Sequence, residues 1–142
     1  MKTGPFVVSA LLLSAAAFSA QGQYVSSLTP NCNSSPNGCN VVVIVPPSCG
    51  NGVRVIPDPI VVRAGDAVRI RWTITGDWDF ADSDGVFIYS GGEKVFKEFT
   101  RAADNKTFTV DFQKPQRGSF KYDMNFKKGA QTCRIDPIIV NW

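Results

Sequence analysis

Hydrophobic and polar residues alternate along most of the chain beyond residue 53, with the two-residue period of strands that bury one face. The alternation is clearest where Val68, Ile70, Trp72 and Ile74 are separated by arginines and threonines. Trp72 is expected in the core because it shares this apolar face. Beyond residue 22, no window repeats a helical period over three turns. The expected strands span residues 40–45, 53–56, 59–63, 68–75, 86–89, 95–99, 107–112, 120–126 and 138–142.

Many short strands separated by turn residues are typical of an all-β fold. We therefore predict an all-β, Greek-key β-sandwich of about 7–9 strands. Residues 23–52 are rich in Asn, Ser, Pro and Gly and are expected to form a separate N-terminal segment with disulfides and one strand. The sandwich itself is expected to span residues 53–142.

One expected strand is an uninterrupted apolar run, from Val41 to Val45, which Pro46 and Pro47 end. Such a run indicates either a strand buried on both faces or an edge strand open to another chain. The second interpretation predicts self-association, with this strand paired to a neighbouring molecule.

Residues 58–62 (Asp-Pro-Ile-Val-Val) are echoed by residues 136–140 (Asp-Pro-Ile-Ile-Val). Two strands could enter one sheet with the same proline-started geometry. Chance is the alternative in a chain rich in Val and Ile, because five residues are too few to indicate a repeat architecture.

The start of the sequence has the composition of a secretion signal. Lys2 precedes an apolar run over residues 6–18, and small residues follow up to Gly22. We expect residues 1–22 to be a signal peptide, with cleavage after Gly22 or after Ser19. An uncleaved anchor is the alternative. No second apolar run follows, so no transmembrane segment is expected after cleavage, and the protein is expected to be periplasmic or secreted.

Composition narrows the function classes. The 142 residues fit one domain, and 15 basic against 12 acidic residues give a net charge of +3, too mild to indicate nucleic-acid binding. The chain has no histidine. This absence excludes Ser-His-Asp and Cys-His catalysis, histidine-ligated zinc and imidazole-ligated copper.

An even number of cysteines in an exported chain indicates disulfides. The four cysteines allow three pairings, and we predict Cys32–Cys39 with Cys49–Cys133. The first pair would close a small polar loop, and the second would tie the N-terminal region to the C-terminal part. A zinc site of four thiolates is the alternative, although the spacing contains no C-x-x-C pair.

Residues 60–72, 114–122 and 138–141 together resemble the cupredoxin family. Residues 60–72 (IVVRAGDAVRIRW) are similar to its early strand pair with a tight Gly-Asp turn. Residues 114–122 (KPQRGSFKY) resemble its "K-P-G-x-Y-x-Y" strand, and residues 138–141 resemble its closing "I-x-V" strand. The resemblance covers about residues 53–142 and implies a sandwich fold.

The chain departs from this family at the copper ligands. Met124 or Asp123 falls near the position of the family's cysteine, and Lys127 falls near that of a histidine. Since thiolate and imidazole ligands are both missing there, the resemblance implies a scaffold without copper or electron transfer. We expect no cofactor.

The most concentrated polar feature lies between residues 77 and 85. It contains Asp77, Asp79, Asp82 and Asp84. Carboxylates before a glycine turn suit calcium, although the spacing is not that of an EF-hand. The alternative is an ordinary acidic loop between strands, because Asp favours turns.

Trp78, Asp79 and Phe80 within this segment suggest an exposed aromatic platform for a protein or glycan ligand. A ring that anchors the loop is the alternative. Loop carboxylates without a recognisable cleft give little basis for catalysis, so no enzymatic activity is expected. The sequence thus predicts an exported, disulfide-stabilised, non-copper cupredoxin-like module for binding or structure. The alternative is an assembly subunit that pairs through the run from Val41 to Val45.

Overall fold

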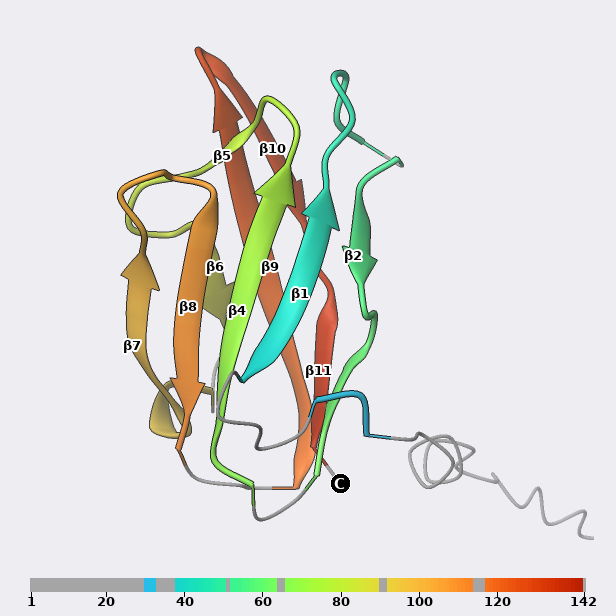
Figure 1. The fold of residues 1–142 in the computed structure, drawn as a ribbon, viewed down its shortest axis with the longest axis vertical. Helices are drawn as coiled ribbons and strands as arrows, with labels where there is room; N and C mark the ends of the chain where they lie inside the picture. Colours follow the sequence, from blue (N-terminus) through green and yellow to red (C-terminus); the bar gives the residue numbers. More distant parts are fainter. Residues whose placement is uncertain are drawn as a thin grey trace, which may run out of the picture.

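The computed structural model describes residues 30–32, 38–50, 52–63, 66–89, 92–113 and 117–141, and these residues contain no α-helix. The predicted signal peptide, residues 1–22, lies outside them. The strands are β1 (Cys39–Ile44), β2 (Arg54–Ile56), β3 (Ile60–Val62), β4 (Val68–Thr75), β5 (Asp79–Phe80), β6 (Val86–Ile88), β7 (Phe96–Arg101), β8 (Thr107–Phe112), β9 (Gly118–Lys128), β10 (Gln131–Ile135) and β11 (Ile138–Asn141), with a 3-10 turn, η2, at Gly92–Lys94. The predicted all-β sandwich is confirmed: two mixed sheets pack against each other (Figure 1).

The first sheet has five strands in the order β2-β1-β4-β8-β7 and lies in front in Figure 1. β1 pairs antiparallel with β2 and parallel with β4, so strands of its own chain occupy both of its edges. Its side chains alternate between buried and exposed. Neither interpretation of the run from Val41 to Val45 therefore describes this strand, which is an inner strand with one solvated face. The segment that the sequence sets apart from the sandwich thus contributes to it.

The second sheet has six strands arranged around β9. β10 and β11 pair with successive parts of β9 in one continuous antiparallel register, from Gln131 opposite Lys128 to Asn141 opposite Gly118. β5 and β6 also both pair with β9, while β3 pairs with β11. The eleven strands exceed the predicted 7–9 because two long stretches that pair with β9 are each divided into two strands, β5 with β6 and β10 with β11. Asp136 and Pro137 interrupt one stretch, and the acidic turn before Gly85 interrupts the other.

The two echoed segments lie next to each other in this sheet. β3 and β11 pair in parallel, with Ile60 opposite Ile139 and Val61 opposite Val140.

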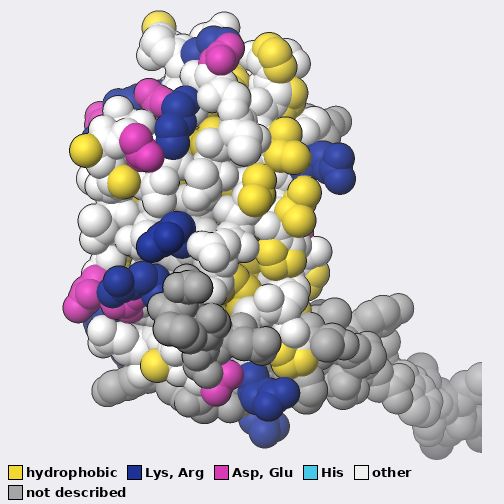
Figure 2. Space-filling view, in the orientation of Figure 1, with side chains coloured by type: hydrophobic (Ala, Val, Ile, Leu, Met, Phe, Trp, Pro, Cys, Tyr) yellow, Lys and Arg dark blue, Asp and Glu magenta, His cyan; other side chains and the backbone are white. Residues whose placement is uncertain are grey.

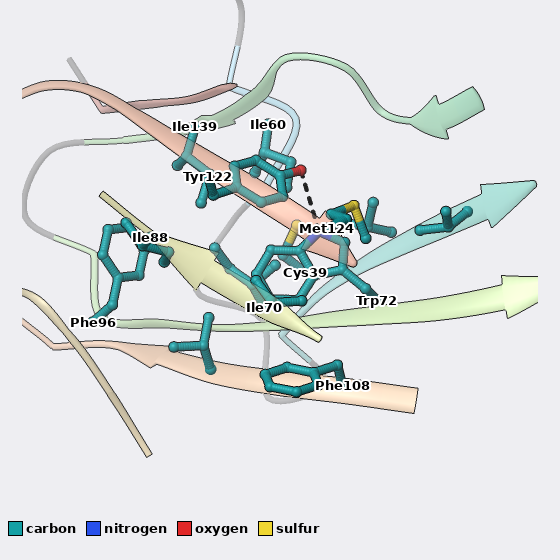
Figure 3. Packing of buried hydrophobic residues seen from close by; sticks show 14 of the residues in the cluster. Cys39, Ile60, Ile70, Trp72, Ile88, Phe96, Phe108, Tyr122, Met124 and Ile139 are labelled. Carbon is teal, nitrogen blue, oxygen red and sulfur yellow. Dashed lines mark hydrogen bonds between the residues drawn. The ribbon is translucent and has the colours of Figure 1, made fainter. Parts of the chain in front are cut away.

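The core fills the space between the two sheets (Figure 3). Trp72 from β4 is fully buried, as predicted, and its indole Nε1 donates to the hydroxyl of Tyr122 on β9 at 3.3 Å. Their ring centroids are 5.5 Å apart. Because the pair comes from different sheets, this hydrogen bond joins the two layers across an apolar interior.

Both predicted disulfides are present. Cys32 is bonded to Cys39 with their Cα atoms 5.0 Å apart, and Cys49 is bonded to Cys133 with their Cα atoms 6.2 Å apart. The second bond joins the segment after β1 to β10 and so connects the two sheets. Since all four thiols are used, the alternative zinc site of four thiolates is not formed.

Among the residues that the structure describes, none belongs to a helix long and apolar enough to cross a membrane.

Candidate functional site

Three of the four carboxylates of the acidic segment, those of Asp77, Asp79 and Asp82, each pair with a different basic side chain. Asp77 pairs with Lys128 at 3.2 Å, and Asp79 pairs with Lys106 at 2.9 Å. Asp82 pairs with both Lys127 and Arg101, and the hydrogen bond from Lys127 lowers the pKa of Asp82. Within the described residues, no group of three His, Cys, Asp or Glu side chains could hold a metal ion. This corrects the calcium interpretation of Asp77, Asp79, Asp82 and Asp84.

Lys106 supplies the cation that organises this segment. Its ammonium group donates to the carbonyl oxygens of Gly76 at 3.0 Å and Trp78 at 2.6 Å, and it pairs with the carboxylate of Asp79. Carbonyl and carboxylate oxygens are also the ligands that calcium prefers. A side chain of the protein thus already satisfies the oxygens that a metal would need.

The structure contradicts the exposure of Trp78 and confirms the other interpretation, a ring that anchors the loop. Its side chain is 2% exposed, and its indole Nε1 donates to the carbonyl oxygen of Pro46 at 2.9 Å. Phe80 is fully buried against Phe108 and Phe126, with ring centroids 5.6 and 5.7 Å away. Both rings anchor the segment, so neither provides a platform for a ligand arriving from solvent.

The residues near the family's copper positions have other roles. Met124 is buried in the core, and Lys127 pairs with Asp82. With all cysteines oxidised and no histidine in the chain, the donors of a blue-copper site are not available. The residues present do not fit copper.

A different group of polar residues meets on the outer face of the six-stranded sheet. Along β9, Tyr122, Met124 and Phe126 point into the core, so Asp123 points outward. Asp123 is nevertheless only 4% exposed. It lies opposite Phe87 of β6, and side chains from the segment after β6 and from β10 contact its carboxylate.

These contacts form a network of Tyr89, Asp123 and Arg134. The Tyr89 hydroxyl donates to Asp123 Oδ2 at 2.7 Å, and this hydrogen bond raises the pKa of Tyr89. Arg134 donates both to the Tyr89 oxygen and to Asp123 Oδ2. Asp123 Oδ1 is buried with no hydrogen-bond partner. A buried oxygen without a donor costs about 1–3 kcal/mol, so such an atom calls for an explanation.

The aromatic ring of Tyr89 in this network and the neighbouring ring of Phe87 are both exposed. Phe87 is 52% exposed and Tyr89 is 37% exposed, and their rings meet edge to face with centroids 5.7 Å apart. Exposed aromatic rings next to fixed polar groups are characteristic of recognition surfaces. We call the network together with Phe87 the Asp123 site.

An open hollow lies on each side of the Asp123 site. The Tyr89 hollow, of about 500 Å³, is lined by Tyr89, Ser119, Phe120, Lys121 and Asp136. The Asn125 hollow, of about 440 Å³, is lined by Ala81, Asp84, Asn125, Phe126, Thr132, Cys133 and Arg134. The Asn125 side-chain amide donates to the Asp84 carbonyl oxygen at 2.6 Å, which fixes its orientation.

The opposite face of the molecule carries a second feature, an apolar stripe over β1 and β2 (Figure 2). Val42, Ile44 and Ile56 are 40%, 37% and 45% exposed, and Val42 lies opposite Ile56 in the β1–β2 pair. These side chains have no hydrogen-bonding group that could orient a ligand. The stripe therefore lacks the fixed polar groups that the Asp123 site offers to a ligand.

Sequence reasoning missed the Asp123 site because its members come from three separate strand regions. Asp123 and Arg134 approach each other only through the register of β9 and β10, in which Arg134 lies opposite Asn125. The available signal was the outward row of Lys121, Asp123 and Asn125 in the alternation of β9. That row could indicate a polar face but could not indicate its partners.

No protein-family model matches the chain, and no curated protein sequence matches it.

Proposed function

We propose that this chain is an exported binding module of the cupredoxin-like type that holds no copper and catalyses no reaction. The observation that carries the proposal is the Asp123 site, in which exposed aromatic rings surround a buried, hydrogen-bonded carboxylate between two hollows. A fixed polar network under exposed rings is a preorganised surface, which lowers the entropic cost of binding.

Binding is tested by comparing two exposed phenylalanines on opposite sheets. Phe87→Ala removes a ring of the Asp123 site, whereas Phe99→Ala removes a ring that is 41% exposed on β7. The purified chain and both variants are incubated with protein and polysaccharide fractions of the source cell's envelope and culture fluid. We expect the unmodified chain and Phe99→Ala to be retained on one fraction and Phe87→Ala to be lost. Equal retention of all three proteins contradicts the proposal.

Export is supported by the signal-like start of the sequence and by the two disulfides, since such bonds persist in oxidising compartments. Cell fractionation with N-terminal sequencing tests it. We expect the chain outside the cytoplasm, beginning at residue 23 or residue 20. Recovery of the full-length chain from the cytoplasm contradicts export.

The absence of a copper function is tested by titrating the oxidised protein with Cu²⁺. No intense visible charge-transfer band is expected, because no thiolate is available as a ligand. Such a band would overturn this part of the proposal.

Assembly through the run from Val41 to Val45 is the less favoured function. Both edges of β1 are hydrogen-bonded within the chain, so pairing with another molecule would require β2 or β4 to leave.

A further inference from the structure

We infer that the Asp123 site binds an uncharged glycan chain, which lies along β9 from the Tyr89 hollow to the Asn125 hollow. This inference rests on the proposed binding function and names the ligand class.

The geometry favours an elongated ligand. Lys121 in the Tyr89 hollow and Asn125 in the Asn125 hollow occupy outward positions of β9, and Asp123 lies midway between them. Four residues of a strand span roughly 13 Å. A ligand that reaches both hollows must therefore cross Tyr89 and Arg134, which cover Asp123.

The chemistry of the surface matches that of a sugar ring. Sugars present apolar C–H faces together with hydroxyl groups. Phe87 and Tyr89 offer rings on which a C–H face can pack, and Tyr89 adds a hydroxyl. The hollows add hydroxyl, amide and carboxyl groups from Ser119, Asn125 and Asp136, which suit hydroxyl recognition.

The charge balance favours a ligand without charge. Arg134 is neutralised by Asp123. With that pair set aside, the charged residues that line the two hollows are one basic residue, Lys121, and two acidic residues, Asp84 and Asp136, so basic groups are not in surplus. A site for phosphate, sulfate or uronate would carry a surplus of basic groups, as charge complementarity requires.

Asp123 acts as a positioning residue in this inference. Its carboxylate holds the Tyr89 ring and the Arg134 guanidinium in place before a ligand arrives. Its second oxygen, Oδ1, has no donor.

The test titrates the isotopically labelled, oxidised chain with defined hexasaccharides and follows amide NMR shifts. The neutral probes are β-1,4-glucan, β-1,3-glucan, α-1,4-glucan and β-1,4-N-acetylglucosamine hexamers, and the charged probe is a hexagalacturonate. We expect one neutral probe to shift amides of residues 87–89, 119–125 and 132–136. We expect Tyr89→Ala to weaken that binding roughly tenfold or more, since stacking and a hydrogen bond are lost together.

Two further variants keep the inference testable if Tyr89→Ala perturbs folding. Phe87→Ala removes only a surface ring and is also expected to weaken binding. Tyr89→Phe retains the ring but removes the hydroxyl that donates to Asp123. It should therefore weaken binding less than Tyr89→Ala does. Phe99→Ala, on the other sheet, is expected to bind with unchanged affinity.

The outcomes separate this inference from the proposed function. If no hexasaccharide shifts these amides while Phe87→Ala still abolishes retention on a protein fraction, the glycan inference is wrong and the binding function stands. If the hexagalacturonate binds more tightly than every neutral probe, the charge argument is overturned. If Phe87→Ala and Phe99→Ala behave alike in both assays, the site and the function fail together.

Discussion

Asp123 is an outward-facing residue that the structure buries by covering it with other side chains. A charged side chain is seldom buried unless it is paired, because its desolvation costs several kcal/mol. Here Arg134 and the Tyr89 hydroxyl supply the pairing for one carboxylate oxygen, while the other has no partner. The position is thus a poor choice for stability alone, and the proposed binding function would account for it.

Titration of Tyr89 checks whether this network exists in solution. We expect the pKa of Tyr89 to lie above the ordinary tyrosine value of about 10, because its hydrogen bond to Asp123 favours the neutral phenol. A raised pKa contributes stability that is fully present below the ordinary value and is lost as pH rises through the value in the folded protein. Stability is therefore expected to decline more steeply above pH 10 in the unmodified chain than in Tyr89→Phe.

The measurement is phenolate absorbance, taken as the difference between the unmodified chain and Tyr89→Phe, so that other tyrosines cancel. In an Asp123→Asn background, the same difference titration should give a lower pKa. A normal Tyr89 pKa in the unmodified chain contradicts the network.

Lys106 provides a second prediction at the residue scale. Lys106→Met keeps the length of the side chain but removes the cation that holds Gly76, Trp78 and Asp79. We expect the free energy of unfolding to fall by about 1–3 kcal/mol, because charge-assisted hydrogen bonds to partly buried oxygens are lost. Urea denaturation, monitored by circular dichroism, measures this change in the free energy of unfolding.

Lys128→Met is the matched control. It breaks the exposed pair of Lys128 with Asp77, and the expected change is within about 0.5 kcal/mol. Equal effects of the two substitutions would mean that Lys106 has no special role. The addition of millimolar calcium is expected to restore the stability of neither variant.

At the scale of elements, alternation predicted the strands that carry three or more buried residues on one face. β4 and β8 show this pattern in full, and each occupies an inner position of its sheet. β5 has two residues and β10 has one buried residue, so neither offers a period that sequence reasoning can detect. β5 and β10 form because β9 extends beyond its other partner strands, so that the free length of its edges is available for pairing.

The candidate site was less predictable than the fold. Trp78 was expected to be exposed because carboxylates flank it, yet those carboxylates point to their cations while the indole turns inward to Pro46. Local sequence cannot distinguish these two directions. Asp123 and Arg134, in turn, meet only through strand register, which depends on the whole sheet.

The two disulfides give a prediction at the same scale. In the chain-entropy model, a bond closing 84 residues stabilises by about 4.6 kcal/mol, and one closing 7 residues by about 2.4 kcal/mol. Cys49→Ala with Cys133→Ala is therefore expected to cost more stability than Cys32→Ala with Cys39→Ala. Chemical denaturation of the two double variants compares them. The reverse order would show that the Cys32–Cys39 bond acts mainly through packing near β3, since Cys32 bridges to Val62.

At the scale of the whole molecule, covalent and polar links cross between the sheets, among them the hydrogen bond from Arg101 of β7 to the Phe80 carbonyl oxygen of β5. The Cys49–Cys133 bond joins the two sheets covalently, and the hydrogen bond from Trp72 to Tyr122 joins them inside the core (Figure 3). Burial raises the pKa of Tyr122, so its hydroxyl stays protonated through the neutral range. The outer face of one sheet carries the apolar stripe, and the outer face of the other sheet carries the Asp123 site.

The core link is the last prediction. Tyr122→Phe removes the hydroxyl and leaves the buried indole N–H of Trp72 without an acceptor, so we expect a loss of about 1–3 kcal/mol. Trp72→Phe removes the donor and also creates a cavity, which raises its expected cost above that of Tyr122→Phe. In a double-mutant cycle, the two losses should add to more than the cost of the double variant, because the unsatisfied N–H penalty is absent once Trp72 is replaced. Strict additivity in urea denaturation would mean that this hydrogen bond contributes nothing to holding the two sheets together.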